Sequence, residues 1–168
     1  MIELDFEIDC LTHSIRNVAT GDSLQTNVLP LTKADLKTVS KKNKWRFNWR
    51  TEFDAADREV YKLVICDNPD VIQGLVCFTV SSDHIFMDLV ESAPFNIGIN
   101  KMYDGVCGNL TAYVCKRAFE QGFEGAVSFL SKTNLIAHYI RTLGAIHIGG
   151  GRMIMPSMAS KNLVDNYF

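Results

Sequence analysis

Residues 102–110 contain the feature with the clearest chemistry, a run of small residues where a helical apolar pattern begins. Gly105, Cys107 and Gly108 are the small residues of this run. The first N–H groups of a helix have no partner within the helix, and the helix dipole favours an anion beside them. Because small side chains leave the approach to these groups open, the run predicts a site for an anionic group such as a pyrophosphate.

The stretch before this run is expected to form strands. Residues 60–65, 71–80 and 85–91 are rich in apolar and β-branched side chains, and turn-forming residues at 67–70 and 81–83 separate them. This pattern predicts an antiparallel meander with short loops.

The stretch after it is expected to alternate between helices and a strand. A helix is predicted over 106–121, a short buried strand over 126–130, and a second helix whose apolar face is formed by Leu135, Ile136, Tyr139, Ile140 and Leu143 before Gly144 ends it. The apolar stripe of the first helix consists of Cys107, Leu110, Val114 and Ala118.

Both ends of the chain are expected to add smaller elements. Alternating apolar residues predict a half-buried strand over 2–8, and residues 14–30 are typical of an irregular strand or hairpin. Thr32 to Asp35 has the character of a capping box that opens a short helix. Other expected elements are a short helix or lid over 45–57, a turn at 149–151 and a helix over 157–167.

This order and the run at 102–110 resemble the GNAT superfamily of N-acetyltransferases. GNAT proteins follow their fourth strand with Arg/Gln-x-x-Gly-x-Gly/Ala, and then with a helix that has an apolar residue three positions on. Met102, Gly105, Cys107 and Leu110 occupy these places. Met102 replaces the usual Arg or Gln, and Cys107 replaces Gly or Ala. The hydrogen-bond donors of the motif are backbone groups, so both changes leave its mechanism possible.

The resemblance implies a fold and a co-substrate. The fold is α/β (α+β), with a mixed, mostly antiparallel sheet splayed between the strands at 85–91 and 126–130 and helices on both faces. The co-substrate is acetyl-CoA, and no metal is expected. The implied cofactor-binding residues are Leu89, Val90, Met102, Tyr103, Gly105, Val106, Cys107, Gly108, Asn109, Leu110 and Asn134. Asn134 is alternatively a helix cap.

The GNAT reaction is the attack of an amine on a thioester, and it needs a base and an acid. Glu91, at the expected end of its strand, is the candidate base; the alternative is a rim carboxylate or one that orders a loop. Tyr139 is the candidate acid, although Ile140 falls where the family has its tyrosine; the alternative is a packed phenol with a bonded hydroxyl. His138 is expected on the surface.

The acceptor side is expected within the first 57 residues. Trp45, Phe47 and Trp49, interleaved with Arg46 and Arg50, either line an acceptor or RNA-facing mouth or anchor a mobile segment on the core. The first function we consider is N-acyl transfer to an unidentified amine. The second is a non-catalytic GNAT-fold module that binds CoA or serves in regulation. The third is a toxin-like acetyltransferase of aminoacyl-tRNA, against which the near-neutral charge argues.

Composition limits these alternatives. The chain has 168 residues, 47% of them hydrophobic and 21% charged, with a net charge of −2, which predicts one domain and no broad attraction to nucleic acid or membranes. Its expected parts are an acceptor side at about 1–57, a CoA-binding core at about 58–156 and a terminal helix at about 157–167. The odd number of cysteines, the acidic N-terminus and the lack of a long apolar run predict a cytoplasmic protein. The expected partner is a small-molecule or peptide amine, with a tRNA acceptor and a homodimer left open.

Overall fold

A seven-stranded mixed sheet forms the centre of the structure, a computed structural model that describes residues 1–168. Its strand order is β3-β4-β5-β6-β8-β10-β9. The strands are β3 (Thr26–Pro30), β4 (Glu59–Ile65), β5 (Asn68–Val80), β6 (Ile85–Ser92), β8 (Val127–Leu130), β10 (Arg152–Met155) and β9 (Ile146–His147). A smaller sheet joins β1 (Ile15–Asn17), β2 (Ser23–Leu24) and β7 (Tyr103–Asp104). The predicted fold class is confirmed.

The meander of β4, β5 and β6 is confirmed, but the turn predicted at 67–70 is wrong. The chain reverses at 66–67, and Asn68 to Asp70 already belong to β5. Pro69 is tolerated there because the β4–β5 register shifts from Ile65↔Asn68 to Val64↔Ile72. The residues between these pairs have no ladder partner, so the missing N–H of Pro69 costs no hydrogen bond.

The predicted splay between β6 and β8 is confirmed. These parallel strands pair only at Ile85↔Val127 and Phe86↔Ser128. Just beyond, Met87 pairs with Phe78 and Leu89 with Cys77, which leaves Asp88 as an extra residue on β6. Such a bulge bends a strand and increases its twist, and it lies where β6 turns away from β8. We call the space beyond the last pair the β6–β8 opening.

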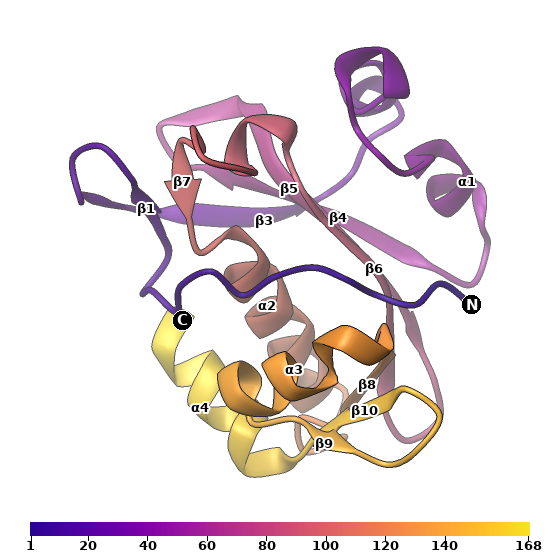
Figure 1. Ribbon diagram of the computed structural model, residues 1–168. Coiled ribbons are helices and arrows are strands. Elements are labelled where there is room, and N and C mark those ends of the chain that lie inside the picture. Colours follow the sequence, from indigo (N-terminus) through magenta and orange to yellow (C-terminus); the bar gives the residue numbers. More distant parts are fainter.

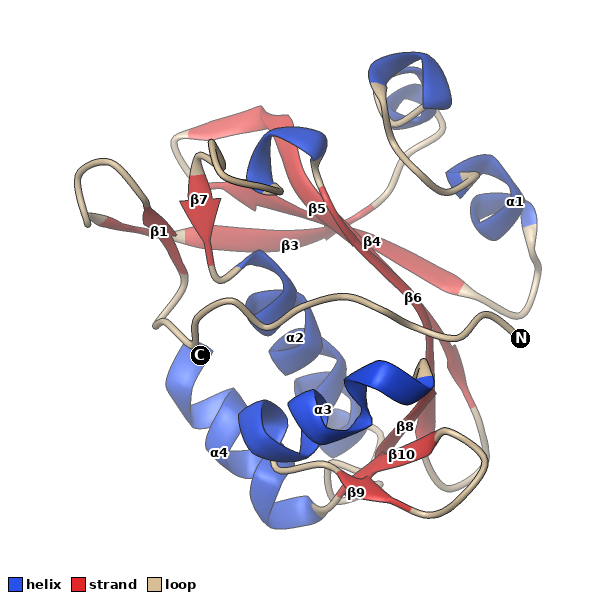
Figure 2. Ribbon diagram, viewed as in Figure 1, coloured by secondary structure: helices blue, strands red, loops and turns tan.

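Helices cover both faces of the sheet (Figures 1 and 2). Gly74 lies under the first turn of α2, and Cys77, an odd number of residues along the same strand, contacts Glu52 of α1. Because side chains alternate along a strand, α1 and α2 lie on opposite faces. The helices are α1 (Trp49–Asp54), α2 (Val106–Glu120), α3 (Ile136–Leu143) and α4 (Ser157–Tyr167), with 3₁₀ turns at Ala34–Lys37, Lys41–Asn43, Pro94–Asn96 and Thr133–Leu135. No helix has both the length and the apolar composition needed to cross a membrane.

The predicted helices agree with the structure, except that Ile140, expected on the apolar face of α3, is 47% exposed. The four residues of the predicted stripe on α2 are buried, and Gly144 caps α3 in the left-handed conformation, with φ 71°. The capping box is also present, because Thr32 N–H donates to Asp35 Oδ2 and Asp35 N–H donates to Thr32 Oγ1. The turn it opens is 3₁₀ rather than α-helical.

The N-terminal segment, residues 2–12, is the main departure from the predicted elements. It crosses the front of the molecule and joins no sheet as a regular strand (Figure 1). Only Leu4 forms a bridge, a parallel one with Ser131. The alternation is nevertheless real, because Leu4, Phe6 and Ile8 are buried in the main core.

The close approach of α2 to β5 depends on Gly74. A Cβ atom at this position would lie 2.6 Å from Val106 Cγ1 and 3.0 Å from Leu110 Cδ1. We expect Gly74→Ala to lower the free energy of unfolding by about 1–3 kcal/mol, because it overpacks this contact. Chemical denaturation measures the change, with Asp70→Ala on the exposed start of β5 as the control. Equal stability of the two variants would contradict this account of the packing.

Candidate functional site

The N-terminus of α2 lies beside the β6–β8 opening and contacts an anion that the chain itself provides. Gly105 is the residue that caps α2, in the left-handed conformation with φ 88°, which favours glycine. Its N–H donates to Asp9 Oδ1 at 3.1 Å. The predicted anion site therefore holds a carboxylate of the N-terminal segment.

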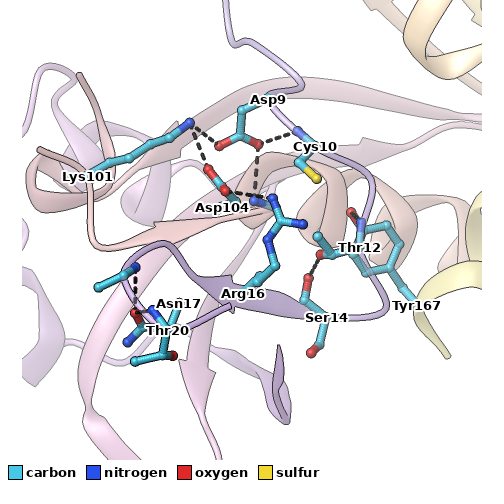
Figure 3. A network of polar contacts seen from close by, with 12 residues as sticks. Asp9, Cys10, Thr12, Ser14, Arg16, Asn17, Thr20, Lys101, Asp104 and Tyr167 are labelled. Atoms are coloured by element: carbon cyan, nitrogen blue, oxygen red, sulfur yellow. Dashed lines mark hydrogen bonds and ion pairs between the residues drawn. The ribbon is translucent and has the colours of Figure 1, made fainter. Parts of the chain in front are cut away.

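Two cations surround this contact (Figure 3). Lys101 Nζ lies 2.9 Å from Asp9 Oδ2 and 2.9 Å from Asp104 Oδ1, and Arg16 bonds Asp104 Oδ2 at 3.0 Å. Burial favours the neutral acid at Asp104, but the hydrogen bonds from Lys101 and Arg16 outweigh it and lower the pKa of this carboxyl. Two cations and two carboxylates thus balance each other beside the start of α2.

The small residues of the run allow parts of the chain to approach closely. A Cβ atom at Gly105 would collide with Thr12, and one at Gly108 would collide with the Tyr167 hydroxyl. Thr12 N–H donates to that hydroxyl at 3.1 Å. In this conformation the N-terminal segment and the end of α4 cover the start of α2.

The other predicted cofactor-binding residues fall into three groups. Val106, Cys107, Gly108, Asn109 and Leu110 are buried on α2, and Leu89 and Val90 are buried on β6. Met102 is exposed, and Tyr103 is half-buried, with its N–H bonded to Asn96 Oδ1. Asn134 is exposed and forms no side-chain hydrogen bond, so its alternative role as a cap is wrong.

The cysteines are all free thiols. Cys77, Cys107 and Cys115 are buried, whereas Cys10 and Cys66 are partly exposed. Burial raises the pKa of Cys107 and of Cys115 to about 12. No group of three or more His, Cys, Asp or Glu side chains is arranged to hold a metal ion.

Glu91 lies at the end of β6 as predicted, and its carboxylate is fully engaged. Oε2 accepts the Arg46 N–H at 2.6 Å, while Oε1 accepts the Trp49 indole N–H at 2.7 Å and the Phe47 N–H at 3.3 Å. Only 6% of the residue is exposed. This geometry favours the alternative left open by the sequence, a carboxylate that orders a loop.

Tyr139 and His138 both contact the N-terminal segment. The Tyr139 hydroxyl donates to the Phe6 carbonyl at 2.6 Å, and His138 Nε2 accepts the Ile8 N–H at 2.9 Å. Burial raises the pKa of Tyr139, so its phenol stays protonated near neutral pH. The hydroxyl is thus a donor at the β6–β8 opening.

A cleft of about 640 Å³ lies between the N-terminal segment and the end of β6, and Tyr139, which is 0% exposed, does not line it. The N-terminal segment forms one wall with residues 5–7 and 9, and the end of β6 forms another with residues 90–92. Arg46, Phe47 and Cys107 also line it. The cleft therefore brings Val90, Glu91 and Cys107 together, whereas Asn134 is not among its lining residues.

The aromatic run at 45–49 anchors its segment on the core. Trp45 and Trp49 are 5% and 1% exposed, which supports the anchoring alternative over an RNA-facing mouth. Arg46 forms two hydrogen bonds of 2.9 Å with Asp5. Phe47 alone of the three aromatic residues lines the cleft.

The chain has the GNAT fold. It is similar in structure to a chimera of the spermidine N-acetyltransferase SpeG from Vibrio cholerae and hSSAT, with a TM-score of 0.60 and 14% identity over 82% of this chain and 99% of that one. It is also similar to KacTA from a complex with DNA (TM-score 0.53, 13% identity, 84% and 99% covered). A transcriptional regulator from Bacillus halodurans gives a TM-score of 0.52 at 14% identity, with 76% and 97% covered. No family model matches the sequence, and neither does any curated protein.

The contribution of the N-terminal segment to the site was not predicted from the sequence. The segment bonds residues far from it in the chain: Asp5 binds Lys132, Asp9 binds Lys101 and Gly105, and the Ile8 N–H binds His138. One pattern could have revealed part of this. Carboxylates alternate with the apolar residues of the segment, at Glu3, Asp5, Glu7 and Asp9, so one side is apolar and the other can bind cations.

We expect Glu91→Gln to lower the free energy of unfolding by about 1–3 kcal/mol, because an amide nitrogen would face one of the three N–H donors. The environment of Trp49 should change with it. Denaturation followed by tryptophan fluorescence measures both effects, and Glu120→Gln at the end of α2 serves as the control. Unchanged stability would show that the carboxylate does not order residues 46–49.

Proposed function

We propose that the protein is an N-acetyltransferase that transfers an acetyl group from acetyl-CoA to an amine. The observation that carries this proposal is the anion contact at Gly105, at the start of α2 and beside the β6–β8 opening. The GNAT fold supports the same reaction class.

The residues at the start of α2 fit the anionic part of acetyl-CoA. The Gly105 N–H and Lys101 already bind an anion there, the Asp9 carboxylate. A pyrophosphate needs the same donors and the same favourable dipole. We propose that Gly105 to Gly108 and Lys101 hold the pyrophosphate, and that Leu89 and Val90 lie along the pantetheine arm.

When bound, acetyl-CoA supplies a thioester: the amine nitrogen forms the new C–N bond while the C–S bond breaks. Tyr139 then donates its hydroxyl proton to the sulfur that leaves, and it recovers a proton from water. Glu91, which lines the cleft, stays our candidate to accept the amine proton through a water. Three N–H donors already engage its two oxygens.

The acceptor we propose is a small-molecule or peptide amine. The SpeG structures are named for spermidine, which supports a small amine. KacTA is described in a complex with DNA, but the net charge of −2 in this chain gives no general attraction to nucleic acid. The cleft is lined by both signs of charge, so it selects the acceptor by local contacts.

Acetyl-CoA should bind with micromolar affinity, about 8 kcal/mol, and removing its phosphates should weaken binding strongly. Acetyl-pantetheine keeps the thioester and the arm but lacks the pyrophosphate, so we expect its affinity to be about 100-fold lower. Isothermal titration calorimetry with both compounds on the unmodified protein gives the comparison. Equal affinities would contradict a phosphate site at α2, and no binding of acetyl-CoA would contradict the proposed function.

Tyr139→Phe should lower kcat by about 10²–10⁴-fold, because the leaving sulfur loses its proton donor, and it should leave acetyl-CoA no weaker bound. Thiol release from acetyl-CoA with a panel of amines measures the rate. Tyr113→Phe, which removes a phenol hydroxyl on α2 that accepts from Arg117, is the control. A Tyr139→Phe enzyme with the unmodified rate would exclude this residue as the acid.

A second function is favoured by the covered start of α2. Because Thr12 and Tyr167 lie against Gly105 and Gly108, the chain could serve as a GNAT-fold module without turnover. Binding of acetyl-CoA without transfer to any amine in the same assay would support this second function over the first.

A further inference from the structure

The N-terminal segment occupies the β8 side of the β6–β8 opening by pairing with the end of β8. Leu4 N–H donates to the Leu130 carbonyl at 2.6 Å, and Lys132 N–H donates to the Leu4 carbonyl at 3.0 Å. These bonds lie on the edge of β8 that β6 leaves free beyond Ser128. At Leu4 the segment thus takes the place of β6 as the parallel neighbour of β8, through a single bridge to Ser131.

Asp5 connects the two sides of this opening. Its carboxylate binds Lys132 at 2.7 Å, just after β8, and Arg46 at 2.9 Å, whose own N–H is bonded to Glu91 at the end of β6. Burial opposes the charge, but the bonds to Arg46 and Lys132 outweigh it and lower the pKa of Asp5. The ionised Asp5 carboxylate therefore links Lys132, just after β8, to Arg46, which is bonded to the end of β6.

The same segment engages the groups on which the proposed reaction depends. The Phe6 carbonyl accepts a hydrogen bond from the Tyr139 hydroxyl. Asp9 accepts the Gly105 N–H and pairs with Lys101 (Figure 3). An extended backbone thus lies beside the predicted acid, with a carboxylate at the start of α2. Acetyl-CoA has the same two features, because its pantetheine arm carries amide groups and ends at the anionic pyrophosphate.

We propose that residues 4–9 form an autoinhibitory segment that competes with acetyl-CoA for the β6–β8 opening, and this inference rests on the proposed function. Acetyl-CoA binds only when these residues leave, so its apparent affinity is reduced by the fraction of molecules that are open. Departure of the segment also frees the Tyr139 hydroxyl. The device couples binding of the co-substrate to activation of the predicted acid.

Hydrogen exchange of the unmodified protein tests the competition directly. An ordinary ligand slows exchange around its site, whereas a competing segment exchanges faster once it is displaced. We expect the amides of Leu4 and Ile8 to exchange at least about tenfold faster with saturating acetyl-CoA. Slower or unchanged exchange at residues 4–8 with the ligand bound would overturn the proposal while the proposed function stands.

Two substitutions test the same competition through affinity. Leu4→Pro removes the N–H bonded to Leu130 without changing charge, and Ile2→Pro is its control, because Ile2 is exposed and its N–H is not bonded. We expect Leu4→Pro to bind acetyl-CoA about tenfold more tightly and Ile2→Pro to match the unmodified protein. Equal affinities in two folded variants would count against the segment.

Asp9→Asn provides a second test if Leu4→Pro does not fold, with Asp22→Asn as its exposed control. Removing the carboxylate frees the Gly105 N–H and Lys101, so we expect tighter binding of acetyl-CoA and faster exchange at Ile8 before any ligand is added. Unchanged affinity and unchanged exchange at Ile8 in a folded Asp9→Asn variant would count against the segment. Failure of the unmodified protein and of all these variants to bind acetyl-CoA would overturn the proposed function and this inference with it.

Discussion

The rest of the structure depends on the early separation of β6 from β8. Two parallel pairs join these strands, and the bulge at Asp88 then turns β6 away. Buried backbone N–H and C=O groups need hydrogen-bond partners, so the free edge of β8 requires an extended chain beside it. Leu4 provides that chain here. Any extended molecule with amide groups, including a pantetheine arm, could meet the same requirement.

The start of α2 imposes a second requirement, this time for negative charge. Its free N–H groups and the neighbouring Lys101 and Arg16 favour an anion. Asp9 satisfies part of this demand at Gly105. The competition that we propose follows because one segment meets both requirements at once, the hydrogen bonds of the edge and the charge of the helix start.

Local patterns predicted most of the elements and few of their long-range contacts. The periodicity of α2 and α3 was sufficient to place both helices, because a helix is set by neighbours three and four residues away. The alternation of residues 2–8 predicted the burial of Leu4, Phe6 and Ile8, although Ile2 is exposed. It could not predict their partners, because Ile8, for example, bonds His138 about 130 residues away. The prediction of a turn at 67–70 was wrong because the local sequence around Pro69 is the same whether the proline lies in a turn or at a register shift within a strand.

The same limit applies to the candidate site. Glu91 and Tyr139 stay predictions that follow from their places in a strand and a helix; Glu91 lines the cleft, whereas Tyr139 is buried against the Phe6 carbonyl. The sequence could not show that three N–H groups from residues 46–49 bond Glu91, since no local pattern couples positions more than 40 residues apart. Small residues in the run were read as open space, whereas the structure packs Thr12 and Tyr167 against them.

The cysteines of the chain differ in exposure, so thiol reagents can distinguish them. Cys107 and Cys115 are shielded and their thiols stay protonated at neutral pH, because burial raises each pKa to about 12. Cys10 and Cys66 are the partly exposed thiols, and they set the background of any colorimetric measurement of released CoA. Cys10 follows Asp9 directly in the chain, so its rate of alkylation reports the position of the N-terminal segment without any label.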